Sequence, residues 1–193
     1  MKKLALSAGL RLLAAPALAH SGHGETSGLV AGLSHPVFGP DHLLAMLAVG
    51  LWSGFVLPGR FWAGAATFMG AMVAGAGLSW SGVPIPNVET WITASVAVFG
   101  LLTILARQGQ SRQVTGASLA AIALFAMCHG HAHATEASGN ALAYLAGFLM
   151  ATGALHLAGI GLARAIACGR AARLVQAGLG AGITGAGLWM MAG

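Results

Sequence analysis

Charged residues are scarce in this chain of 193 residues, and acidic residues are the scarcest. Asp, Glu, Lys and Arg make up 7% of the sequence, whereas hydrophobic residues make up 57% and the mean hydropathy is +0.80. A soluble domain usually carries about 25% charged residues, so this chain lacks the polar groups to cover a water-facing surface. The composition predicts an all-α, polytopic membrane helix bundle, with room for about six or seven spans of ~20 residues.

Several signatures of chemistry are also missing. No Gly-x-x-x-x-Gly-Lys-[Ser/Thr] loop is present, so nothing in the sequence indicates the use of ATP. No nucleophile–base pair is evident, so we do not expect an enzyme. The two cysteines, Cys128 and Cys168, lie in or near different apolar segments. A buried Cys is usually just a small apolar residue, so nothing indicates a disulfide.

The N-terminus has the form of a secretory signal peptide. A short basic start, Met1-Lys2-Lys3, precedes an apolar stretch that ends in Ala17-Leu18-Ala19, a small-x-small cleavage site. We predict that residues 1–19 are a cleaved signal peptide and that residues 20–27 form a short periplasmic N-terminus containing histidine. Arg11 interrupts the apolar stretch, and the alternative is an uncleaved, poorly inserted anchor.

Six apolar segments follow, at residues 28–55, 61–80, 88–106, 114–136, 140–163 and 171–192. If the mature N-terminus lies outside, every remaining basic residue falls in a cytoplasmic loop, as the positive-inside rule requires. These residues are Arg60, Arg107, Arg112, Arg164, Arg170 and Arg173. Residues 28–193 therefore predict six transmembrane helices, with both ends of the mature chain outside. The net charge of +5 marks topology, so we expect lipid around the chain and no nucleic-acid partner.

Residues 35–46 read HPVFGPDHLLAM and place polar groups inside the first span. Asp41 is the only aspartate of the chain and falls near the membrane midplane, where an aspartate costs roughly 2.5–3.5 kcal/mol. Pro36 and Pro40 flank Gly39, and a proline removes a backbone donor and clashes with the preceding turn. We therefore predict that the first helix is kinked or broken here, which lipid tolerates only where the backbone lines a polar cavity or contacts protein.

Histidines dominate both polar clusters. His35 and His42 belong to the first cluster, and residues 128–136, CHGHAHATE, form the second. His129, His133 and Glu136 share one helical face, an arrangement that suits a borderline divalent metal ion. The candidate ligands are therefore His35, Asp41, His42, His129, His133 and Glu136. Together these groups are too costly in lipid to be purely structural.

Weaker candidates are Met46, one turn beyond His42, His156 in the fifth span, and the N-terminal residues His20 and His23. A lone intramembrane histidine such as His156 can equally bond a neighbouring carbonyl, and His20 and His23 can equally belong to a solvated tail. His131 points away from its neighbours on the same helix, so we expect it to be structural or interfacial.

The two clusters carry a resemblance to the HupE/UreJ family of bacterial nickel permeases. Every fixed position of the family's first signature, His-Pro-x-x-Gly-x-Asp-His-x-x-x-Met, is matched at residues 35–46. The second, Phe-His-Gly-x-Ala-His-Gly-x-Glu, is matched except that Cys128 replaces Phe and Ala134 replaces the second Gly. The resemblance implies a six-helix permease domain in the bacterial inner membrane, with both ends of the mature chain periplasmic. It implies transport of Ni²⁺ or Co²⁺ without a resident cofactor, and supply of that metal to enzymes such as hydrogenase or urease.

The residues alone indicate a divalent transition-metal pathway, because imidazole-rich sites do not by themselves select nickel. Two other hypotheses stay open: a non-transporting accessory protein for metalloenzyme maturation, and a b-type haem carrier in which His156 pairs with His42 or His129. For a permease we expect the first and fourth spans to be neighbours, with His35 facing His129. The energy source and the oligomeric state stay open.

Overall fold

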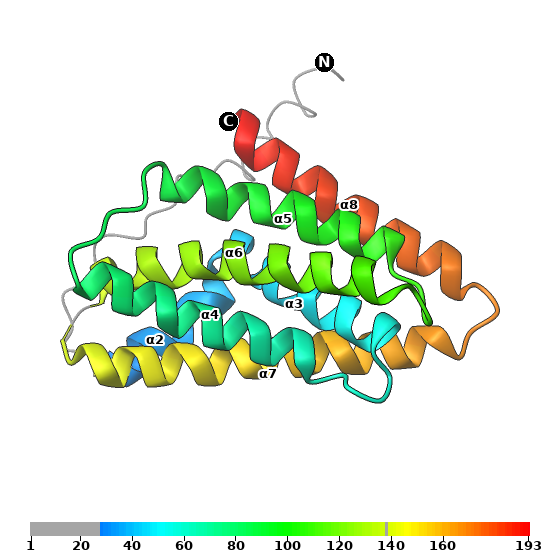
Figure 1. Ribbon diagram of the computed structural model, residues 1–193, viewed down its shortest axis with the longest axis horizontal. Coiled ribbons are helices and arrows are strands. Elements are labelled where there is room, and N and C mark those ends of the chain that lie inside the picture. The colour runs from blue at the N-terminus through cyan, green and yellow to red at the C-terminus, as the bar shows by residue number, and fades with distance from the viewer. Residues whose placement is uncertain (1–27, 138) are drawn as a thin grey trace, which may run out of the picture.

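A computed structural model describes residues 28–137 and 139–193, which are helical with short connections (Figure 1). The helices of these residues are α2 (Gly28–Phe38), α3 (Pro40–Val56), α4 (Ala63–Trp80), α5 (Val88–Leu105), α6 (Arg112–Glu136), α7 (Ala141–Ala167) and α8 (Ala172–Ala192). No strand occurs in these ranges. The predicted signal peptide, His20 and His23 lie outside the described residues.

Helices α5, α6, α7 and α8 are long and apolar enough to cross a membrane, judged by length and composition. Helix α4 has 18 residues, and α2 and α3 are shorter apolar helices. The chain is thus an all-α, multi-pass membrane protein, as the composition predicts. The count of six spans stays a prediction.

The first apolar segment is broken at Gly39, as the two prolines predict. Helix α2 ends at Phe38 and α3 begins at Pro40, with Gly39 in an extended conformation between them. Pro40 suits the first position of a helix, where no backbone donor is needed. Both halves pack along α7, with Gly32 of α2 against the backbone of Tyr144 and Gly50 of α3 against that of His156.

Polar caps begin the two longest helices. The Ser111 hydroxyl accepts a hydrogen bond from the Val114 amide at the start of α6, and the Asn140 side chain accepts one from the Ala143 amide at the start of α7. Such caps satisfy amides that have no partner within the first turn. These caps fix the residues at which α6 and α7 begin.

Charge is segregated between the two ends of the bundle. The connections α3–α4, α5–α6 and α7–α8 gather at one end, and the connections α4–α5 and α6–α7 gather at the other (Figure 1). All arginines of the described residues belong to the first end, while Glu89 and Glu136 belong to the second. This arrangement is the one that the positive-inside rule requires.

Glycines allow close packing between particular helices. A Cβ added at Gly130 would overlap the carbonyl oxygen of Met72, and one at Gly75 would overlap that of Met127, so α4 and α6 meet backbone to backbone. Gly178 and Gly182 of α8 take no part in such packing. Both lie on an exposed face of α8, and a Cβ at either would meet nothing within 4 Å. The glycine pattern alone could not show which face of α8 meets α5.

Candidate metal centre

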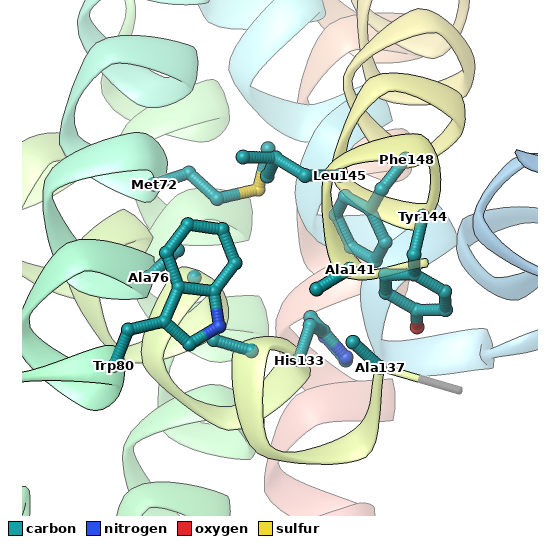
Figure 2. Close-up of a pocket in the computed structure, with 11 residues that line it drawn as sticks. Met72, Ala76, Trp80, His133, Ala137, Ala141, Tyr144, Leu145 and Phe148 are labelled. Atoms are coloured by element: carbon teal, nitrogen blue, oxygen red, sulfur yellow. The ribbon is translucent and has the colours of Figure 1, made fainter. Parts of the chain in front are cut away.

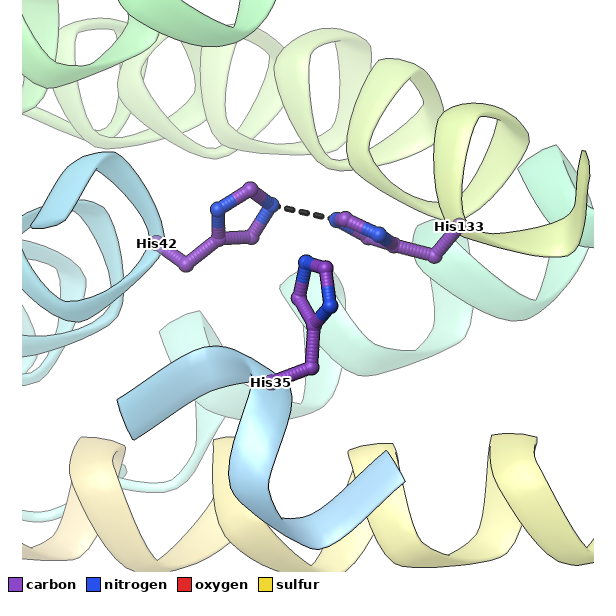
Figure 3. Close-up of side chains that lie close together, drawn as sticks. All are labelled: His35, His42 and His133. Atoms are coloured by element: carbon purple, nitrogen blue, oxygen red, sulfur yellow. Dashed lines mark hydrogen bonds between the residues drawn. The ribbon is translucent and has the colours of Figure 1, made fainter. Parts of the chain in front are cut away.

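Three histidines from three helices converge near the end of the bundle opposite the arginines (Figure 3). They are His35 of α2, His42 of α3 and His133 of α6, and one ring nitrogen of each lies within 4.8 Å of the others. The His133 ring lies 4.5 Å from that of His35 and 4.3 Å from that of His42, measured between centroids. His42 and His133 are buried, and the side chain of His35 is 30% exposed. The cluster is therefore partly open on the side of His35.

The break at Gly39 makes this convergence possible. His35 lies at the end of α2 and His42 in the first turn of α3, so the bend lets both rings face the same point. A Cβ at Gly39 would come within 3.1 Å of both Asp41 Oδ1 and His42 Nδ1. Glycine therefore leaves the space that the Asp41–His42 pair occupies.

The Asp41 carboxylate determines which nitrogen of His42 is free to bind a ligand. Asp41 Oδ1 accepts the Nδ1–H of His42 at 2.7 Å and the backbone N–H of the same residue at 2.8 Å. A neutral imidazole has a single N–H group, so Nε2 of His42 carries a lone pair. A carboxylate behind a histidine in this way is typical of metal ligands, because it orients the ring and raises its basicity.

His133 repeats this arrangement from the other side of the site. Glu136 Oε2 accepts its Nδ1–H at 3.2 Å, which leaves a lone pair on Nε2. This Nε2 is in direct contact with Nε2 of His42 (Figure 3). Two lone pairs that face each other repel unless a cation lies between them. The carboxylates thus arrange His42 and His133 as a pair of donors for a cation.

His129 lies one helical turn before His133 on α6, and it is fully buried. The Ser95 hydroxyl gives its hydrogen to the Ile92 carbonyl at 2.6 Å, so its oxygen accepts the Nε2–H of His129 at 3.0 Å. The remaining nitrogen, Nδ1, has no hydrogen-bond partner. The His129 ring lies 4.8 Å from that of His42, so a fourth imidazole donor adjoins the cluster.

Comparison with known proteins decides the family. The sequence profile described as HupE / UreJ protein matches residues 8–190. The chain belongs to the HupE/UreJ family. It is 36% identical over 196 residues to "Protein HupE" of Rhizobium leguminosarum bv. viciae, and the similarity covers 100% of both chains. No solved structure matches it.

The pairing of histidines in this HupE/UreJ chain differs from the expected one. We expected His35 to face His129, but His35 faces His133, and His129 faces His42. The break at Gly39 turns α2 relative to α3, and residue spacing does not show which rings this turn brings together. Asp41 and Glu136, also expected as ligands, accept hydrogen bonds from His42 and His133, and Glu136 Oε2 lies 3.9 Å from Nε2 of His35.

Among the described residues, the weaker candidates Met46 and His156 lie outside the cluster, and so does His131, which was expected to be structural or interfacial. His131 turns away from it and bonds the Val83 carbonyl through Nε2 at 2.8 Å, which ties α6 to the α4–α5 connection. Met46 is fully buried in the hydrophobic core. His156 is fully buried deeper in the bundle, on α7.

Glu89 is a functional candidate that the sequence analysis missed. It is exposed in the first turn of α5, and its charge interacts with those of Glu136 and Asp41. Glu89 and Glu136 thus belong to the end of the bundle at which the histidine cluster lies, and acidic side chains there attract cations. The signal was available, because Glu89 is one of only four acidic residues in the chain.

A small cavity adjoins His133 between α4, α6 and α7 (Figure 2). Its volume is about 10 Å³, which is room for roughly one water molecule. Trp80, Tyr144 and Phe148 are among the side chains that line it, and the Tyr144 hydroxyl is buried without a hydrogen-bond partner. The histidines are thus packed closely, with one narrow cavity beside them.

Proposed function

We propose that this chain is an inner-membrane permease for divalent transition-metal ions, with Ni²⁺ or Co²⁺ as substrate. The observation that carries the proposal is the pair of facing Nε2 atoms on His42 and His133, each with a carboxylate behind its ring. Imidazole nitrogen suits nickel, cobalt, copper and zinc. The choice of nickel or cobalt rests on membership in the HupE/UreJ family.

The donors suit a substrate that must leave again. His35, His42 and His133 offer three nitrogens, and His129 offers a fourth one level deeper. Conduction requires sites weak enough to release the ion, so partial sites passed in sequence suit a permease better than one closed cage. Glu89 and Glu136 attract the ion at the mouth, and the histidines pass it inward. This relay uses no ATP, and the gradient or the membrane potential drives it.

The proposed topology follows from the segregation of charge. Helices α2 and α3 form one broken span, and α4 to α8 form five more, after cleavage of residues 1–19. The arginine end faces the cytoplasm and the histidine cluster opens to the periplasm. On this topology His20 and His23, which lie outside the described residues, are periplasmic and can capture metal loosely. On this proposal the cell supplies the imported ion to nickel enzymes such as hydrogenase or urease.

Radiolabelled Ni²⁺ uptake by cells with and without the protein tests the function, with Co²⁺, Zn²⁺ and Cu²⁺ as competitors. We expect uptake that depends on the protein, that Co²⁺ inhibits most strongly, and that His42→Ala abolishes. Unchanged uptake without the protein would favour a non-transporting accessory role. A Soret band in the purified protein would indicate a haem carrier instead.

Native cysteines allow a direct test of the topology. Cys168 is exposed at the arginine end, whereas Cys128 is buried. We expect a membrane-permeant maleimide to label Cys168 in intact cells and an impermeant one to leave it unlabelled. In Cys168→Ala, an added Asn87→Cys should react with the impermeant reagent from outside. The reverse pattern would overturn the orientation.

Uptake should also fall as the external pH decreases through the histidine range, near 6.5 for an unperturbed imidazole. A ligand nitrogen must be unprotonated, so protons compete with the metal for the same lone pairs. Initial uptake rates between about pH 7.5 and 5.5 at fixed Ni²⁺ measure the effect. A rate that rises steadily towards acid pH would show that histidine capture does not control transport.

A further inference from the structure

His156 is a buried histidine that the cluster described above does not use. Its Nδ1 lies 2.8 Å from the Thr152 carbonyl oxygen. A carbonyl can only accept, so Nδ1 carries the hydrogen and Nε2 carries a lone pair. The side chain is fully buried, and Nε2 has no hydrogen-bond partner. Ligand histidines in metal sites are commonly held in this way, with the second nitrogen on a backbone carbonyl.

An unpartnered lone pair in a protein interior needs an explanation, because most buried polar atoms have partners. The hydroxyl of Thr152 is also fully buried and without a partner. Thr152 and His156 are four residues apart on α7, so both belong to one face of the helix. One face of α7 thus carries two buried polar groups without hydrogen-bond partners, the Thr152 hydroxyl and Nε2 of His156.

His156 lies inward from the histidine cluster. Along α7 it is twelve residues beyond Tyr144, roughly 18 Å nearer the arginine end at 1.5 Å per residue. Phe68 joins the two regions, because its ring lies 5.5 Å from that of His129 and 5.1 Å from that of His156.

We propose that His156, together with the Thr152 hydroxyl on the same face of α7, is a second and inner binding site (the inner station) for the same divalent ion. The ion reaches it after His129 and leaves it towards the arginine end. This proposal rests on the proposed transport function for its direction, but the binding of metal to His156 stands independently of transport.

Metal binding to purified protein tests the inner station directly. All variants carry His20→Ala and His23→Ala, and the outer donors are removed by His35→Ala, His42→Ala, His129→Ala and His133→Ala. Equilibrium dialysis with Ni²⁺ should then find one weakly held ion per chain. Adding His156→Gln should remove it, whereas adding His131→Gln should not, although His131 is also buried and bonded to a carbonyl. Residual binding that survives His156→Gln, or the absence of residual binding in a folded protein, would overturn the proposal.

A second test of the inner station needs only one substitution in the native chain. His156→Gln in the otherwise native chain should reduce Ni²⁺ uptake at least about tenfold. The Ni²⁺ affinity of its outer cluster should stay within about twofold of the native value. Its melting temperature should stay within a few degrees of the native value. His131→Gln should transport normally. If His156→Gln also transports normally, the inner station is wrong; if the native chain itself fails to transport, the proposed function is wrong and the dialysis still decides on His156.

Discussion

Asp41→Asn should lower Ni²⁺ uptake by roughly 10- to 100-fold, the usual effect of removing a carboxylate behind a metal-binding histidine. The amide has the shape of the carboxylate but no charge. It can also present its NH₂ group to His42 Nδ1, which would place the imidazole hydrogen on Nε2. Nε2 faces His133, so that tautomer offers a donor where the ion needs a lone pair. The loss should therefore exceed that from removing His20 or His23.

The kinetics of Asp41→Asn separate this role from a structural one. Higher external Ni²⁺ should restore part of the uptake, because the variant weakens binding while the path stays in place. Ser34→Ala is a matched control, since the Ser34 hydroxyl bonds only the Ala31 carbonyl of its own helix. Its uptake should stay within about twofold of the native rate. Normal uptake by Asp41→Asn at normal expression would show that the carboxylate does not set the state of His42.

The elements that the sequence predicted well are those with a local physical cause. Pro36 and Pro40 around Gly39 predicted the helix break, because proline restricts its own residue and the one before it. The scarcity of charge predicted a helical membrane protein. Every second connection contains arginine, and this alternation predicted that those connections lie together at one end of the bundle. The convergence of the two motifs was also anticipated, since buried polar groups in lipid require partners.

The partners within the site could not be read from the sequence. Which histidine faces which depends on how α2 turns relative to α3 at Gly39, and this is a tertiary property. Residue spacing could not show that Ser95, on α5, orients the His129 ring. The inner position of His156 beside Phe68 depends in the same way on packing between α4 and α7.

The position of residues 128–136, the second histidine motif, depends on a contact between the backbones of α4 and α6. Gly130 lies between His129 and His133 in sequence and packs directly on the Met72 carbonyl of α4. Gly75 makes the reciprocal contact with the Met127 carbonyl of α6. A methyl group at Gly130 would clash with the backbone of α4, and a backbone cannot rotate away as a flexible side chain would.

Gly130→Ala should therefore push α4 away from α6, lower the stability and abolish uptake. Overpacking of this kind costs about 1–3 kcal/mol, so the melting temperature in detergent should fall by roughly 2–12 °C. Gly116→Ala is the matched control, because Gly116 lies on the same helix and a Cβ there meets nothing within 4 Å. It should match or slightly exceed native stability, since alanine favours a helix over glycine. If Gly130→Ala were as stable and active as Gly116→Ala, backbone contact with α4 would not be what places His129 and His133 opposite His42.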